Sequence, residues 1–267
     1  MPATHATTAA ATTTSAPPVR PPAATGPVLF HPTVARLTYR ALLGRRRALL
    51  LFALPLLLLI IVSAVRALTG ADDDTANHLL QGFALGSMVP LIGVIAGTGA
   101  IGPEIDDGAI VYLLAKPIRR STIIFTKLLV AIGVTAAFSA IPVLIAGYIL
   151  NGNGLNMAVA YGVAAAVASL TYAAIFLMLG VITRHAVVAG LVYALVWESV
   201  IGNVVPGART LSVQQWALAI AQKISDGGVV TSEVALPTAV VLLVLVTTAA
   251  TGFAVHKLRT LKLAGEE

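Results

Sequence analysis

Charged residues gather between long apolar runs in one stretch of the sequence, Gly102-Pro-Glu-Ile-Asp-Asp-Gly-Ala-Ile-Val-Tyr-Leu-Leu-Ala-Lys-Pro-Ile-Arg-Arg-Ser121. Three carboxylates come first in it and three cations come last, and apolar residues recur at helical spacing between them. This order of charges suits the dipole of a helix, and Pro117 disfavours helical geometry at Lys116. The pattern predicts a short helix at a membrane surface, a corner, and a second helix from Ile118. The charges alone are equally compatible with an ordinary cytoplasmic loop.

The runs on both sides of this stretch are apolar enough for a bilayer. Hydrophobic residues make up 58% of the 267 and charged residues only 10%, whereas an average soluble domain has about 25% charged residues. The mean hydropathy is +0.92. Six runs approach the roughly 20 residues that a membrane helix needs: Leu49–Leu68, Leu79–Ile101, Thr122–Leu150, Met157–Thr183, Ala186–Val205 and Val234–Val255. We therefore predict an all-α, polytopic membrane protein with six transmembrane helices, the third of which projects beyond the membrane or bends at Pro142.

Lys and Arg residues concentrate on one side of the predicted spans. That side holds Arg36, Arg40, Arg45, Arg46, Arg47, Lys116, Arg119, Arg120, Lys127, Arg184, Lys257, Arg259 and Lys262. The opposite side holds only Arg66, Arg209 and Lys223. By the positive-inside rule, both termini and the central charged stretch are expected to be cytoplasmic, in a multi-pass protein of the plasma membrane.

The N-terminal part of the chain divides into a tail and a basic segment. Residues 1–28 are mostly Ala, Thr, Pro and Ser and cannot bury enough apolar surface to fold, so we expect a disordered tail and a membrane domain over residues 29–267. From Val34 to Arg47, arginines alternate with apolar residues, which predicts an amphipathic helix at the membrane interface. A plain basic flank of the first span explains the same residues.

The outer side of the predicted bundle contains one long connection and one buried acid. Within the connection, the mixed polar and apolar run Leu211–Ile224 predicts a helix resting on the outer membrane face, with Trp216 at the interface. Glu198 is the only acidic residue inside a predicted span, where a charge costs roughly 2.5–3.5 kcal/mol at the centre. It is a candidate for the transport path or its outer gate, or else a structural hydrogen-bonding group near the outer loop.

A glycine-rich segment at the end of the second span has two interpretations. Gly97-Thr-Gly-Ala-Ile-Gly102 matches the G-x-G-x-x-G pattern, but it closes an apolar span and does not join a strand to a helix, so we reject it as a cofactor site. The pairs Gly82/Gly86 and Gly93/Gly97 instead allow close helix contacts, which we assign to packing within the subunit in preference to a subunit interface.

Several function classes lack their residues in this sequence. The chain has no cysteine, and its five histidines lack the spacing of metal ligands, so we expect no metal site. No G-x-S-x-G elbow and no P-loop occur, which argues against serine hydrolysis and ATP binding in this chain. No basic patch interleaved with aromatic residues supports nucleic-acid binding.

The order of residues in the central stretch resembles that of the ABC-2 type permeases of ATP-binding-cassette transporters. The matching residues are Gly102, Glu104, Asp107, Gly108, the run Leu113–Arg120 and Lys127. In that family the loop after the second membrane helix forms a coupling helix that docks on a separate ATPase subunit, and an elbow helix precedes the first span. The resemblance assigns ATPase coupling to Glu104, Asp107, Gly108, Lys116, Pro117 and Arg119.

The resemblance implies a permease subunit of an ABC exporter, which is not itself an enzyme. The implied partners are a cytoplasmic ABC ATPase, which would bind ATP and Mg, and a second permease subunit in a homo- or heterodimer surrounded by membrane lipid. Two alternatives remain. A secondary transporter is disfavoured because paired intramembrane charges and an inverted repeat are not evident, and a membrane assembly subunit without transport activity is the third.

Overall fold

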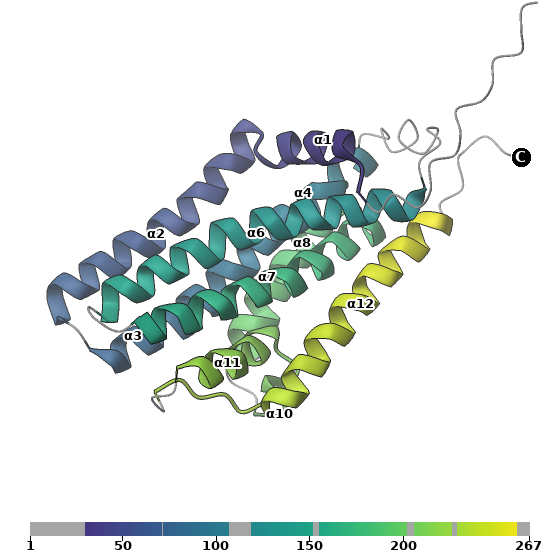
Figure 1. Cartoon of the computed structure of the whole chain (residues 1–267). Helices are drawn as coiled ribbons and strands as arrows, with labels where there is room; N and C mark the ends of the chain where they lie inside the picture. Colours follow the sequence, from purple (N-terminus) through teal and green to yellow (C-terminus); the bar gives the residue numbers. More distant parts are fainter. Residues whose placement is uncertain are drawn as a thin grey trace, which may run out of the picture.

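The computed structural model describes residues 30–70, 72–106, 119–151, 155–201, 206–225 and 229–260. Within these ranges the chain forms helices and no strands (Figure 1). Among the described residues, five helical stretches are long and apolar enough to cross a membrane: Arg47–Thr69, Asp73–Ile105, Arg120–Asn151, Leu155–Ile182 and Leu236–Thr260. The predicted class, an all-α polytopic membrane protein, is confirmed, and the count of six spans stays a prediction.

The first two helices meet at a bend. Helix α1 (Pro32–Leu42) begins with a proline, which suits the first turn because the missing N–H would have no helical partner there. Its buried residues Val34, Thr38 and Leu42 are four apart and lie on one face. Helix α2 (Arg45–Thr69) starts after Gly44 and runs along the outside of the bundle, where most of its side chains are exposed (Figure 1).

The second membrane stretch is one helical run with a wider segment inside it. It consists of α3 (Asp73–Leu79), the π-helix η1 (Leu80–Met88) and α4 (Val89–Asp106). Asp72 caps α3, because its carboxylate accepts hydrogen bonds from the hydroxyl and the backbone amide of Thr75. These two hydrogen bonds, the hydroxyl first, hold the pKa of Asp72 below its ordinary value. The π-helix ends two residues before Pro90, which has no N–H to continue the helical ladder.

Helix α7 (Leu155–Ile182) lies at the centre and packs against α4, α6, α11 and α12. Glycines bring α4 and α7 together: a Cβ placed on Gly93 would lie 2.9 Å from the Cβ of Tyr172, and one on Gly97 would lie 2.6 Å from the Cβ of Phe176. The contacts of Gly93 and Gly97 therefore lie within one subunit, which is the interpretation that the sequence favoured for these two glycines. Gly86 packs against Gln214, whereas a Cβ added to Gly82 would have no neighbour within 4 Å.

The third predicted span is one long helix. Helix α6 (Arg120–Asn151) has 32 residues and continues through Pro142. At 1.5 Å per residue its length is about 48 Å, which exceeds the roughly 30 Å of a bilayer core. Its length alone therefore allows either end to extend past the apolar layer.

The fifth predicted span, residues 186–205, is short in the structure. It begins as α8 (Ala186–Val192) and continues as the π-helix η2 (Tyr193–Ile201), while residues 202–205 lie outside the described residues. The chain then forms α10 (Pro206–Arg209), α11 (Val213–Ile224) and α12 (Leu236–Thr260). Figure 1 shows α3, α10 and α11 at one end of the bundle, and α1 with the last turns of α12 at the other.

Two expectations need correction. Helix α11 does not rest on the outer surface: Trp216 is buried, and its indole N–H donates to the carbonyl of Thr210, because α11 packs against α7 and α12. Residues 102–106 do not begin a separate surface helix but continue α4, with Pro103 inside it. The rest of the expected coupling helix, residues 107–118, and the tail of residues 1–28 lie outside the described residues.

Candidate functional site

The predicted coupling residues divide into two groups. Asp107, Gly108, Lys116 and Pro117 lie outside the described residues. Of the other two, Glu104 lies in the last turns of α4, and Arg119 is an exposed residue directly before α6. Glu104 and Arg119 do not form an ion pair with each other in the structure, and Glu104 pairs with another cation.

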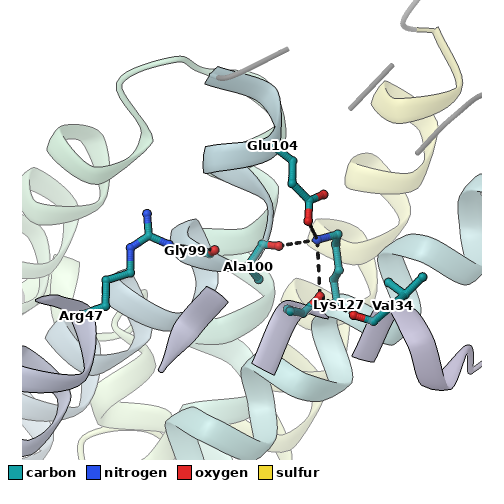
Figure 2. A network of polar contacts seen from close by, with 7 residues as sticks. Val34, Arg47, Gly99, Ala100, Glu104 and Lys127 are labelled. Atoms are coloured by element: carbon teal, nitrogen blue, oxygen red, sulfur yellow. Dashed lines mark hydrogen bonds and ion pairs between the residues drawn. The ribbon is translucent and has the colours of Figure 1, made fainter. Parts of the chain in front are cut away.

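Lys127 is the partner of Glu104. Its ammonium Nζ lies 2.6 Å from Glu104 Oε1 and donates to the carbonyl of Ala100 at 2.6 Å and to Thr38 Oγ1 at 3.4 Å (Figure 2). The Thr38 hydroxyl in turn donates to the carbonyl of Val34. We call Thr38, Ala100, Glu104 and Lys127 the Lys127 junction. It connects α1, α4 and α6 through a single side chain.

Burial makes each charge of this pair depend on its partner more than in a surface pair. The Lys127 side chain is 1% exposed and that of Glu104 is 29% exposed. An ammonium with three N–H donors and three acceptors is fully hydrogen-bonded, which offsets its loss of water. Removing one partner of a buried pair typically costs about 3–5 kcal/mol. Glu104 Oε2 is also buried and has no hydrogen-bond partner among the described residues.

Arg47 stabilises the same end of α4 at the neighbouring carbonyl. Pro103 has no N–H, so the carbonyl of Gly99, four residues earlier, lacks its helical donor. Arg47 Nη1 donates to this carbonyl at 3.1 Å (Figure 2). Basic residues from α2 and α6 therefore bind adjacent carbonyls at the end of α4.

Two further contacts close this end of the bundle. The backbone N–H of His31 donates to Thr126 Oγ1 at 3.0 Å, which joins the start of α1 to α6. Arg120 Nη1 donates to the carbonyls of Leu258 and Arg259, at 3.0 and 2.6 Å, and so satisfies acceptors in the last turn of α12.

Sequence reasoning placed Lys127 in the charged loop and did not identify its role. The structure places it about two turns inside α6, where it is buried. Glu104 likewise lies in the helical continuation of the second span, so Glu198 is not the only acid within these helices. The available signal was a lone lysine at the start of a long apolar run. Its partner could not be identified, because that depends on which helices pack together.

Glu198 lies at the other end of the bundle and is fully buried. Its Oε1 accepts from Tyr193 Oη at 2.9 Å and from the amide of Val213 at 3.1 Å. Its Oε2 accepts from Ser212 Oγ at 2.5 Å and from the amide of Gln214 at 3.4 Å. The carboxylate of η2 thus caps the N-terminus of α11, where a negative charge is favourable. These hydrogen bonds are sufficient to explain Glu198 as a structural group, and its role in the transport path stays a prediction.

No group of three His, Asp or Glu residues within the described part of the chain could hold a metal ion. The comparison with protein families gives one match: the family described as ABC-2 family transporter protein matches residues 32–254. This match starts at the first residue of α1 and ends within α12, so it includes the Lys127 junction and Glu198. No curated protein matches the chain closely enough to count as a relative.

Proposed function

Because the chain belongs to the ABC-2 family of transporter proteins, we propose that it is the permease subunit of an ABC exporter coupled to a separate cytoplasmic ATPase. The proposed contact is the loop of residues 102–120, with Glu104, Asp107, Gly108, Lys116, Pro117 and Arg119 as the coupling residues. ATP and Mg would be bound by the ATPase. This chain would pair with a second permease subunit, identical or different, within the lipid of the plasma membrane.

The Lys127 junction is the observation that supports coupling through this loop. Glu104 lies near the start of this loop and Lys127 shortly after its end, so their ion pair joins the two sides of its base. A force on the loop would reach α4 and α6 together through this pair, and α1 through Thr38. A rigid base transmits motion, whereas a flexible one would absorb it.

The proposed topology has six spans, with both termini and the loop in the cytoplasm. The charge asymmetry supports this orientation. This count adds to the five long helices the short run of α8 and η2, which is fifth in chain order and carries Glu198, the cap of α11. Helix α1 would be the amphipathic elbow: its buried face packs on α4 and α6, and Arg36, Leu37 and Arg40 are exposed. The transport domain would be residues 29–267, preceded by the tail of residues 1–28.

Arg119 is the sharpest probe of ATPase docking. Glu104 is already paired with Lys127, so changing it disturbs the junction as well, whereas Arg119 is exposed at the end of the loop. Arg119→Glu should strongly reduce co-purification of the partner ATPase and nucleotide-dependent transport in vesicles, and thermal stability should be unchanged. The matched control is Lys223→Glu, an exposed cation at the end of α11, at the opposite end of the bundle.

The outcomes separate the proposed function from its alternatives. Normal ATPase binding and transport by Arg119→Glu would refute docking through this residue. If Lys223→Glu lost ATPase binding and Arg119→Glu kept it, the proposed orientation in the membrane would be the wrong way round. Transport by the purified chain without nucleotide would indicate a secondary transporter, and no transport under any condition would indicate an assembly subunit.

A further inference from the structure

A small basic cavity lies next to the Lys127 junction. It has a volume of about 170 Å³ and is enclosed by the start of α2, the end of α4 and the turn that joins α7 to α8. Its lining includes the polar residues Arg47, Thr98, Thr183, Arg184 and His185, together with Pro103.

The charged residues among the described lining of this cavity are all basic. Its lining contains two arginines and a histidine but no carboxylate. Arg47 uses one N–H group on the carbonyl of Gly99, and a guanidinium has five. The Arg184 side chain is exposed and has no hydrogen-bond or ion-pair partner among the described residues. The hydroxyls of Thr98 and Thr183 add further hydrogen-bonding groups to the lining.

The cavity is large enough for a phosphate group. Its volume corresponds to about six water molecules, at roughly 30 Å³ each, and a phosphate group has five heavy atoms. Arginine pairs bind phosphate well because the planar guanidinium donates two parallel hydrogen bonds to it.

Apolar side chains beside the cavity are exposed. Val187 and Val188 belong to the cavity lining and are 51% and 61% exposed. On α2, Leu50 lies about one turn after Arg47 and is 56% exposed. In a membrane protein, exposed apolar residues next to a basic cavity at the end of a bundle are the arrangement that an anionic lipid needs.

We propose that this cavity binds the phosphate of an anionic phospholipid, with Arg47 and Arg184 as its ligands and the acyl chains along α2 and α8. The lipid would connect the start of α2 to the turn after α7, beside the carbonyls that Arg47 and Lys127 hold. This inference does not require the partner ATPase, so it is tested independently of the proposed function.

The test is lipid binding by the purified full-length chain in detergent, followed by native mass spectrometry. Phosphatidylglycerol and phosphatidylcholine are titrated separately, and the dissociation constant of the first bound lipid is compared. The parent chain should prefer phosphatidylglycerol. Arg184→Gln should lose about fivefold of this preference, the effect of one cation near a lipid phosphate. Arg36→Gln, which removes an exposed arginine of α1 outside the cavity, should bind as the parent does.

Equal losses in the two variants would refute the site, because they would show a general effect of surface charge. Absence of a preference in the parent would refute it as well. Inorganic phosphate is added in a third arm against chloride of equal ionic strength. Displacement of phosphatidylglycerol by phosphate alone would show that the occupant is a free anion and overturn the assignment to lipid. Arg184→Lys separates charge from geometry: it should retain most of the preference, and a loss as large as in Arg184→Gln would contradict phosphate binding by charge.

Discussion

At the scale of single residues, the Lys127 junction predicts an asymmetry between its two charges. Glu104→Gln leaves an ammonium without its counterion in a side chain that is 1% exposed, whereas Lys127→Met leaves a carboxylate in a side chain that is 29% exposed, although its Oε2 is itself buried. Glu104→Gln should therefore destabilise the protein by about 3–5 kcal/mol, and Lys127→Met should destabilise it by less. Thermal unfolding of the purified variants in detergent measures both changes.

The double variant provides the control for this pair. Glu104→Gln with Lys127→Met removes both charges, so it should be more stable than Glu104→Gln alone. Additive losses in the double variant would show that the two side chains do not interact in solution.

Glu198 also predicts a specific effect at this scale. Both carboxylate oxygens accept hydrogen bonds, so Glu198→Gln places an NH2 group where the hydroxyl of Ser212 and the amide of Gln214 donate. We expect a loss of about 1–3 kcal/mol of stability from the unsatisfied donors. Tyr193→Phe removes only one donor and should cost less. A Gln variant with the stability of the parent and impaired transport would favour the transport-path role.

At the scale of secondary-structure elements, the end of α4 depends on a replaced hydrogen bond. Pro103→Ala restores an N–H for the carbonyl of Gly99, which makes the Arg47 contact redundant. Arg47→Met should therefore destabilise the parent by about 1.5–3 kcal/mol, the value for a charged hydrogen bond, and the Pro103→Ala background by less. Equal effects of Arg47→Met in both backgrounds, measured by thermal unfolding, would disprove this coupling.

The contact between α4 and α7 has its own test. In Gly97→Ala the new Cβ would lie 2.6 Å from the Cβ of Phe176 and 3.0 Å from the backbone N of Leu177, so the helices must separate. We expect a loss of about 1–3 kcal/mol from overpacking. Gly82→Ala is the matched control, because nothing lies within 4 Å of its Cβ and alanine favours helix. Equal stability of the two variants would contradict the packing.

At the scale of the whole molecule, the proposed topology predicts which end of the bundle reagents reach from outside the cell. The chain has no cysteine, so introduced cysteines report without background. Asp73→Cys and Ser225→Cys, at the end that carries α3 and α11, should react with a membrane-impermeant maleimide in intact cells. Asp107→Cys and Arg36→Cys should react only after permeabilisation. The reverse pattern of labelling would invert the orientation.

The sequence alone was sufficient for the all-α membrane class, for the family and for the approximate position of five long helices. Apolar runs of about 20 residues and the spacing of charges are local properties that sequence displays directly. Only the tertiary structure decided that Lys127 is buried against Glu104, that Glu198 caps α11, that Trp216 is enclosed, and that the Arg47 and Arg184 side chains line one cavity. Each of these depends on which helices become neighbours. Apolar helices of similar composition do not specify their neighbours, because each of them can bury a similar apolar surface against any other. Close packing at glycines and a few buried polar pairs determine which helices pack together.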